Sequence, residues 1–530
     1  MIRIKGGGIV ADYRKKFKIL FISINSVWRY GNIGMDQLLG FLRKQGFNIE
    51  IGYFRSKESA KNIYMQIQRG YDLYAFSVNI SNYSKCVKIS EMIKEKEPYA
   101  SIVFGGGYPT RYYREILKET DCADYLVLGD GEYPSLYLYD RLARVKEEKT
   151  KNIAIDHPSV ASADNYRNKE GYFNSEITWE PAYDYYEKDD NFTNSRKVHC
   201  IQIKNNVCTG NCSFCTERHG KIVYKNINQV VDQIEYVYQN YKIEKVYFTD
   251  DNILDPNTQK AKQHLRELCI ELQKRKMKLS YQCYIKAFSL KNTEEDHALL
   301  SLMRDTGFVE IFIGIEAGNQ EDLDLYNKFT TVEDNYEIIK LLREHDIFPI
   351  MGYIAFNPYS TRDRIRQNFR FLCDIKCTYL HNYLYSFTVI NKYTALYEMI
   401  KKDKLLLSDE SKYVGVEFSF QNEEVKEVME YVQDKMIPRL RKLDYELDWV
   451  TYSAMEHEVC HAENLIDYRP ILEKQKEKDA LWIKEHLGLL FEDFDVGAFE
   501  NVEEDFWNYF ENEEKLLKMI YEYYISLHYL

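Results

Sequence analysis

Residues 208–215 read Cys208-Thr-Gly-Asn-Cys212-Ser-Phe-Cys215, a C-x3-C-x2-C pattern with an aromatic residue before the last cysteine. We expect a strand over residues 197–204 to lead into this loop. Three thiolates on one short loop can hold three corners of a metal site, and thiolates select iron–sulfur clusters or zinc. Three cysteines are one ligand too few for a four-iron cubane, so one iron would stay open to another molecule.

Alternating strands and helices continue downstream of this loop. We expect strands over residues 245–249, 279–285, 309–316, 348–355 and 382–388, with helices between them. Repeated βα units with polar residues at the strand ends predict a partial (β/α)6 barrel of the TIM type. The active face of such a barrel is the carboxyl end of its strands, where the cysteine loop also falls.

Upstream of the loop the sequence predicts a different α/β fold. Strands are expected over residues 17–24, 47–52, 73–77, 100–104 and 125–128, with helices between them. This alternation predicts a doubly wound, Rossmann-like sheet, which binds ligands beyond the carboxyl ends of its strands. Glycines at 105–107 and at 129 and 131 fall at those ends, where they either let a ligand approach the backbone or only form tight turns.

The domain organisation follows from these patterns. We expect the Rossmann-like domain over residues 1–145, a polar linker over 146–192, the barrel over 193–400 and a helical substrate-shaping domain over 401–530. The net charge of −12 gives no general nucleic-acid footprint, and no apolar run is long enough to span a membrane. The amino terminus lacks the apolar core of a signal peptide, so we expect a cytoplasmic protein whose eleven cysteines are not a disulfide framework.

The cysteine motif, with Phe214 before its last cysteine, resembles the signature of the radical S-adenosylmethionine (SAM) superfamily. Thr249-Asp-Asp-Asn252, Gly314-Ile-Glu-Ala-Gly318 and Met351-Gly-Tyr-Ile354 are similar to later motifs of that family and come in the same order. The resemblance implies that Cys208, Cys212 and Cys215 bind a [4Fe–4S] cluster whose open iron binds SAM. It also implies SAM contacts at Asp250, Asp251, Asn252, Glu316, Gly352 and Ile354.

Three strand ends of the upstream sheet resemble the cobalamin-binding domain of radical enzymes. They are Ser77-Val-Asn-Ile-Ser81, Phe104-Gly-Gly-Gly-Tyr-Pro-Thr110 and Leu128-Gly-Asp-Gly-Glu132. The resemblance implies cobalamin contacts at Ser77, Asn79, Gly105, Gly106, Gly107, Gly129, Gly131 and Glu132. The loop Asn25-Ser-Val-Trp-Arg-Tyr-Gly-Asn-Ile-Gly34 lacks the Asp-x-His pair whose histidine ligates cobalt in some of these domains. Either no histidine of this motif binds the lower face, or the domain has lost cobalamin and kept its fold.

Together the two halves resemble the cobalamin-dependent radical SAM methylases. The resemblance implies methylation of an unactivated carbon of a natural-product or peptide substrate, through a 5′-deoxyadenosyl radical and methylcobalamin. The implied partners are a small-molecule or peptide substrate and an electron donor such as flavodoxin or ferredoxin, with no nucleic acid and no membrane. The sequence assigns no catalytic side chain and does not identify the substrate.

Two alternatives stay open from the sequence. A radical SAM enzyme of the same architecture could perform a rearrangement or a cyclisation, with or without cobalamin. A non-enzymatic binding module could instead use Cys208, Cys212 and Cys215 with His219 as a structural zinc site. Cys373 and Cys377 lie one helical turn apart, and for these two we favour a pair of buried core thiols over an auxiliary cluster.

Overall fold

The computed structural model describes residues 12–25, 32–149, 155–167, 169–171, 181–184, 198–205, 207–216, 221–377, 381–407, 415–443, 446–460 and 465–526. The chain forms two compact units. One consists of Met1–Cys200 with Gln239–Ile243, and the other of Ile201–Tyr238 with Glu244–Leu530. None of the described helices is long and apolar enough to cross a lipid bilayer.

The described part of the first unit contains a six-stranded sheet with the order β2-β1-β3-β4-β5-β6. Its strands are β1 (Lys18–Asn25), β2 (Asn48–Arg55), β3 (Leu73–Ser77), β4 (Ser101–Gly105), β5 (Tyr125–Val127) and β6 (Val160–Ala161). β1 to β5 pair in parallel, and β6 pairs antiparallel with β5. The predicted Rossmann-like sheet is confirmed, and its strand order reverses between β1 and β3, which is where such sheets bind ligands.

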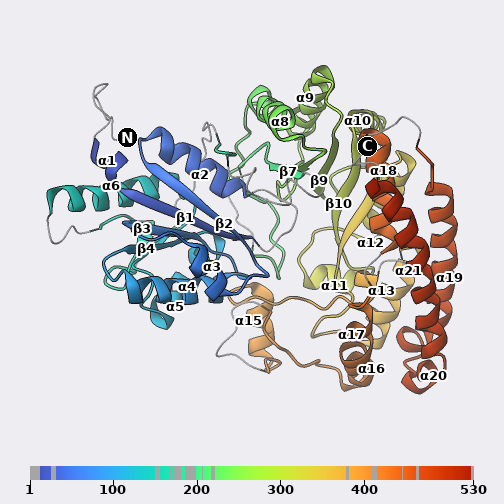
Figure 1. The fold of residues 1–530 in the computed structure, drawn as a ribbon. Coiled ribbons are helices and arrows are strands. Elements are labelled where there is room, and N and C mark those ends of the chain that lie inside the picture. Colours follow the sequence, from blue (N-terminus) through green and yellow to red (C-terminus); the bar gives the residue numbers. More distant parts are fainter. Residues whose placement is uncertain are drawn as a thin grey trace. The chain divides into compact units, whose positions relative to one another are not determined.

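Helices cover both faces of this sheet (Figure 1). α1, α2 and α6 lie on one face, and α3, α4 and α5 lie on the other. Their bounds are α1 (Asp12–Lys16), α2 (Ile33–Lys44), α3 (Ala60–Gln66), α4 (Tyr83–Lys96), α5 (Gly107–Glu119) and α6 (Glu132–Glu148). The two helical layers bury the sheet on both sides, as the near-continuous apolar strands predict.

Asn82 ties together the two strands at the reversal point. Its side-chain amide donates to the carbonyl of Ile24 on β1 (2.9 Å) and to that of Ser77 on β3 (3.0 Å). Gly106 approaches the same end of β3, with φ 113° and ψ −173°, a region open essentially only to glycine. A Cβ atom at Gly106 would lie 2.6 Å from the carbonyl oxygen of Val78. This glycine is therefore required by the backbone packing of the sheet.

A second sheet has the order β11-β10-β9-β8-β7 in the part of the chain that the structure describes. β8 to β11 belong to the second unit, and the division between the units falls within β7, after Cys200. The strands are β7 (Val198–Ile201), β8 (Lys245–Phe248), β9 (Ser280–Lys286), β10 (Phe308–Glu316) and β11 (Phe348–Tyr353). β8 to β11 pair in parallel. The helices between and after them are α8 (Ile227–Tyr241), α9 (Gln259–Arg275), α10 (Glu294–Thr306), α11 (Gln320–Leu325), α12 (Val332–Glu344), α13 (Arg362–Asp374), α14 (His381–Leu384) and α15 (Ala395–Lys402).

From Glu423 onward the described part of the second unit is mainly helical, as the sequence predicts. Its elements are η2 (Glu423–Val425), α16 (Lys426–Tyr431), η3 (Val432–Met436), α17 (Ile437–Leu440), α18 (Leu447–Cys460), α19 (Arg469–Phe491), α20 (Val496–Glu500) and α21 (Glu503–Ser526). α18 packs on β9 and β10 and against α19 and α21. Near the amino ends of the strands, Lys245 forms ion pairs with Glu310 (3.1 Å) and with Glu456 of α18 (2.5 Å).

The prediction of a sixth barrel strand over residues 382–388 is wrong. Residues 381–384 form α14, and only an isolated parallel bridge joins Phe356 to Phe387. Side chains take the hydrogen bonds that a sixth strand would make along the edge of β11. The Met351 N–H donates to the Tyr383 hydroxyl (2.6 Å), and the Ser386 hydroxyl donates to the Tyr353 carbonyl (2.7 Å).

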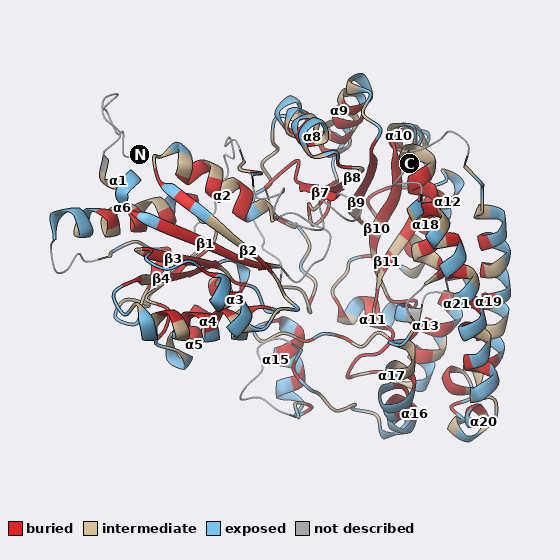
Figure 2. Ribbon diagram, viewed as in Figure 1, coloured by how far each residue is buried: buried red, intermediate tan, exposed pale blue. Residues whose placement is uncertain are grey.

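The carboxyl halves of two barrel strands keep one accessible face. On β9 and β10 the partly exposed residues alternate with buried ones and occur only toward the carboxyl end (Figure 2). They include Tyr284 and Lys286 on β9 and Phe312, Gly314 and Glu316 on β10. The amino halves of the same strands are buried throughout. The sheet is thus filled at one end and accessible at the end that carries the predicted ligand-binding residues.

We predict that Gly106→Ala lowers the stability of the first unit by about 3 kcal/mol, because alanine cannot adopt this backbone conformation without strain and its Cβ would meet the Val78 carbonyl. Gly107→Ala is the matched control, since a Cβ at that position meets nothing within 4 Å. Thermal unfolding monitored by circular dichroism compares the two variants. Equal midpoints for both would contradict the packing role of Gly106.

Candidate active site

Asp255 anchors the first half of the cysteine loop. Its fully buried carboxylate accepts hydrogen bonds from the Thr209 N–H (2.8 Å), the Thr209 hydroxyl (2.8 Å) and Lys286 Nζ (2.7 Å). The side-chain amide of Asn252 donates a further bond (2.8 Å). Burial alone would raise the pKa of Asp255, but the bonds from Lys286 and Thr209 hold it below its usual value. The carboxylate is therefore ionised at neutral pH and fixes Thr209 directly beside Cys208.

The end of α11 anchors the second half of the loop. The Ser213 N–H donates to the Tyr326 carbonyl (2.9 Å), and the Ser213 hydroxyl donates to the Leu325 carbonyl (2.8 Å). The Asn327 amide donates to the carbonyl of Asn211 (2.7 Å). Phe214, the aromatic residue of the motif, packs edge-to-face on Tyr326 with ring centroids 5.4 Å apart. The aromatic position therefore has a structural role, which is to dock the loop on α11.

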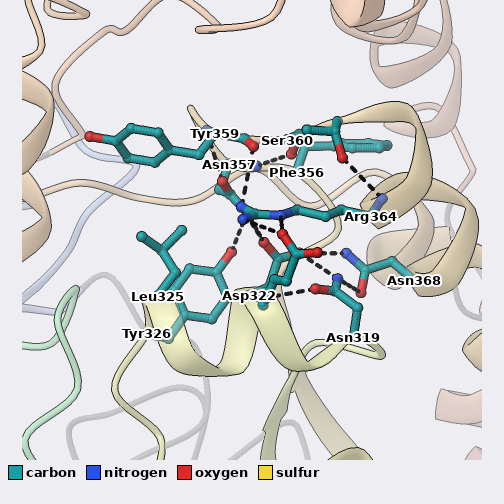
Figure 3. A network of polar contacts seen from close by, with 12 residues as sticks. Asn319, Asp322, Leu325, Tyr326, Phe356, Asn357, Tyr359, Ser360, Arg364 and Asn368 are labelled. Carbon is teal, nitrogen blue, oxygen red and sulfur yellow. Dashed lines mark hydrogen bonds and ion pairs between the residues drawn. The ribbon is translucent and has the colours of Figure 1, made fainter.

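A buried polar network holds α11 itself in place (Figure 3). Asp322 is fully buried at its centre and accepts from the amides of Asn319 (2.6 Å), Asn357 (2.8 Å) and Asn368 (3.1 Å). Arg364 of α13 approaches the same carboxylate at 3.4 Å. A buried charge is tolerated only when it is well paired and hydrogen-bonded. The network thus fixes α11, and with it the cysteine loop, to α13 and to the segment after β11.

Glu316 ends β10 in a left-handed conformation with φ 65°, at a register shift between β10 and β11. The buried amide of Asn335 supports this turn by donating to the carbonyls of Ile315 (3.2 Å) and Ala317 (2.9 Å). The Glu316 carboxylate pairs with Lys328 Nζ at 3.1 Å. Two glycines leave room for this pair. A Cβ at Gly314 would lie 2.8 Å from Lys328 Nζ, and one at Gly352 would lie 3.3 Å from Glu316 Oε2.

Two thiols of the loop, those of Cys208 and Cys212, are influenced by nearby lysines. Burial raises the pKa of Cys208, while a hydrogen bond from the Gly210 N–H (3.3 Å) and the charge of Lys286 oppose the increase. Burial also raises the pKa of Cys212, and the charge of Lys328 opposes it. The Gly210 N–H and the charges of the two lysines all favour the thiolate form, which is the form that binds metals.

Two family models match the chain. The model of the radical SAM superfamily matches residues 203–372, and that of the B12 binding domain matches residues 19–137. The chain joins a B12-binding domain to a radical SAM domain. Its cofactors are accordingly a [4Fe–4S] cluster, SAM and cobalamin.

The chain is similar to curated proteins and to solved structures. The anaerobic magnesium-protoporphyrin IX monomethyl ester cyclase of Cereibacter sphaeroides is 27% identical over 295 residues, which cover 53% of this chain and 45% of that protein. The chain spans about half the length of the curated relatives it matches. Among structures, the radical enzyme OxsB with aqua-cobalamin bound superposes with a TM-score of 0.70 and 16% identity, over 96% of this chain and 80% of that one. The methyltransferase TsrM from Kitasatospora setae reaches 0.53 and 17% over 74% and 79%.

The donor atoms of the radical SAM domain fit an iron–sulfur cluster, because three thiols that keep exposed surface lie on one short loop. Cys208, Cys212 and Cys215 are all partly exposed, whereas most other cysteines are buried. Among the described residues, no three His, Cys, Asp or Glu side chains converge closely enough to hold one metal ion. His219, the fourth ligand of the zinc alternative, lies outside the described residues.

The three residues after β8 that are predicted to contact SAM differ from one another in burial. Asp250 is fully buried and accepts the N–H groups of Ile203 and Lys204, each at 3.0 Å. Asn252 is fully buried and binds Asp255, whereas Asp251 is partly exposed. Of the three side chains, that of Asp251 is the accessible one. SAM contacts by Asp250–Asn252 stay a prediction, as do those of Glu316, Gly352 and Ile354, which are all partly exposed.

The B12-binding domain gathers its predicted residues at the carboxyl ends of β3, β4 and β5. Ser77, Asn79, Gly105, Gly106, Gly107, Gly129 and Gly131 all keep exposed surface, and Glu132 is buried at the start of α6. Asn79 is occupied locally, because its side chain accepts the N–H groups of Ser81 and Asn82. The backbone at Gly107 borders open space, which fits a large planar ligand. These cobalamin contacts stay a prediction.

Sequence reasoning missed the residues that hold the cysteine loop. Asp255, Lys286, Asp322 and Lys328 carry no role in the motifs, and they meet their partners only in the folded chain. The one local signal is the position of Lys286, which is the last residue of β9, and of Asp255, which follows β8 at the carboxyl edge of the sheet. Buried charges at such an edge indicate either a ligand or a support for ligand-binding residues.

We predict that Gly314→Ala weakens SAM binding at least tenfold without loss of iron, because the new methyl group would displace the Lys328–Glu316 pair. Gly488→Ala in α19 is the control, since a Cβ there meets nothing within 4 Å. Equilibrium binding of SAM to the reconstituted proteins gives the comparison. If Gly314→Ala binds SAM with unchanged affinity, the predicted contact between Glu316 and SAM is contradicted.

Proposed function

We propose that this protein is a cobalamin-dependent radical SAM enzyme that methylates an unactivated carbon of a natural-product or peptide substrate. The observation that carries the proposal is the presence of a three-cysteine loop and a B12-binding sheet in one chain. The fold shared with the methyltransferase TsrM supports it. An external one-electron donor of the flavodoxin or ferredoxin kind would serve the cluster, and we place the reaction in the cytoplasm.

The loop after β1 also supports methyl transfer. Residues 25–34 contain no histidine, so this loop offers no imidazole to the lower face of a corrinoid. Residues 26–31 of the loop lie outside the described part of the structure. A corrinoid that is weakly held from below is better suited to passing on a methyl group than one with a strong lower ligand.

Each part of the second unit would have a separate task. Cys208, Cys212 and Cys215 would hold the cluster, and Glu316 and Asp251 would orient SAM at the accessible ends of the strands. The buried amino halves of β9 and β10 exclude water from the opposite end of the sheet. When bound, the cluster with SAM supplies hydrogen abstraction from carbon, and the corrinoid supplies the methyl group. The helices after residue 401 would shape the substrate pocket.

A second candidate is ring formation without methyl transfer. It is favoured by the relative from Cereibacter sphaeroides, which is a cyclase. Both candidates need the same three cysteines and the same contacts to SAM. They differ in the fate of the SAM methyl group, which a cyclisation leaves untouched.

We predict that the reduced holoenzyme with SAM and cobalamin releases S-adenosylhomocysteine as well as 5′-deoxyadenosine. A methylase uses one SAM as methyl donor and another as the source of the radical, and the first use yields S-adenosylhomocysteine. Liquid chromatography with mass spectrometry of the quenched reaction measures both products, with protein prepared without cobalamin as the control. Release of 5′-deoxyadenosine alone would contradict methyl transfer and favour the cyclisation.

A further inference from the structure

Two largely buried lysines lie near the cysteine loop. The side chain of Lys286, at the end of β9, is 14% exposed, and that of Lys328, after α11, is 9% exposed. Each forms an ion pair with a carboxylate, Lys286 with Asp255 and Lys328 with Glu316. Buried lysines are rare unless they are paired, and these two pairs lie against the residues that hold the cluster.

Lys286 lies beside Cys208. Its Nζ donates to the Thr209 hydroxyl at 2.9 Å, on the residue that follows the cysteine. A Cβ built on Gly210 would lie 3.3 Å from Cys208 Sγ and 3.7 Å from Lys286 Nζ, so the sulfur and the ammonium flank the same glycine. The charge of Lys286 lowers the pKa of Cys208 by more than the charge of Asp255 raises it. The ammonium group of Lys286 therefore lies against the two residues that follow Cys208.

Lys328 has the matching position beside Cys212. The segment that carries it is bonded to the loop on both sides of the cysteine, through Asn327 to Asn211 and through Tyr326 to Ser213. The charge of Lys328 lowers the pKa of Cys212 by more than the charge of Glu316 raises it. Lys328 also interacts electrostatically with Cys208. The two lysines thus lie on segments that are hydrogen-bonded to the residues next to Cys208 and Cys212.

We propose that the positive charges of Lys286 and Lys328 set the reduction potential of the cluster. Reduction adds one electron from an external one-electron donor to a cluster that already carries three thiolates, and it moves no proton. Positive charges held in a low-dielectric site stabilise the added negative charge and make the cluster easier to reduce. This inference does not depend on methyl transfer, because methylation and cyclisation both need a reduced cluster.

The test is a redox titration of the anaerobically reconstituted full chain in the absence of SAM, with the reduced cluster followed by electron paramagnetic resonance. Lys286→Met and Lys328→Met should each shift the midpoint potential to more negative values, while the corresponding arginine variants keep the charge and stay near the parent. Lys262→Met is the matched control, since Lys262 forms a comparable ion pair with the buried Asp296 on α10.

Glu316→Gln and Asp255→Asn provide a test of opposite sign. Each leaves its lysine without the neutralising carboxylate, so the midpoint potential should move to more positive values. These variants also decide the matter if a methionine variant does not retain its iron. A potential that stays within error of the parent in variants of equal iron content would overturn the proposal. So would a shift that appears only after SAM is added, since the lysines would then act through SAM.

Discussion

The hydrogen bonds of one buried carboxylate, Asp255, hold the cysteine loop in place. Thr209, Lys286 and Asn252 all donate to it, so the cysteine loop, the end of β9 and the turn after β8 meet at one group. Removing one partner of a buried charge costs about 3–5 kcal/mol in other proteins, because the remaining charge is left uncompensated. These hydrogen bonds hold the start of the cysteine loop at the carboxyl ends of β8 and β9.

The site is built twice on the same principle, which is that parallel strands present their carboxyl ends to a ligand. In the first unit the sheet places Ser77 and the glycines at 105–107 at these ends. In the second unit the accessible face of β9 and β10 occurs only toward the carboxyl end, where Glu316 and the two lysines lie. Supports outside the strands, above all the Asp322 network, keep the second site rigid.

Most of the framework could be predicted from the sequence, because hydrophobic runs mark buried strands directly. β3 has the bounds that the pattern indicates, and the glycines mark strand ends correctly. The prediction failed at residues 382–388, where the tyrosine-rich run resembles a strand but Tyr383 and Ser386 bond the edge of β11 through their side chains. The supports of the cysteine loop were also missed. Lys286 lies 77 residues from Thr209, and no local pattern reports a contact of that range.

The central claim is that three thiolates hold a four-iron cluster and leave one iron for SAM. Mössbauer spectroscopy of protein reconstituted with ⁵⁷Fe tests it most directly. The account predicts that SAM changes the signal of one iron in the cluster and leaves the signals of the other three unchanged. A spectrum that does not respond to SAM, or that shows four equivalent irons throughout, would contradict it.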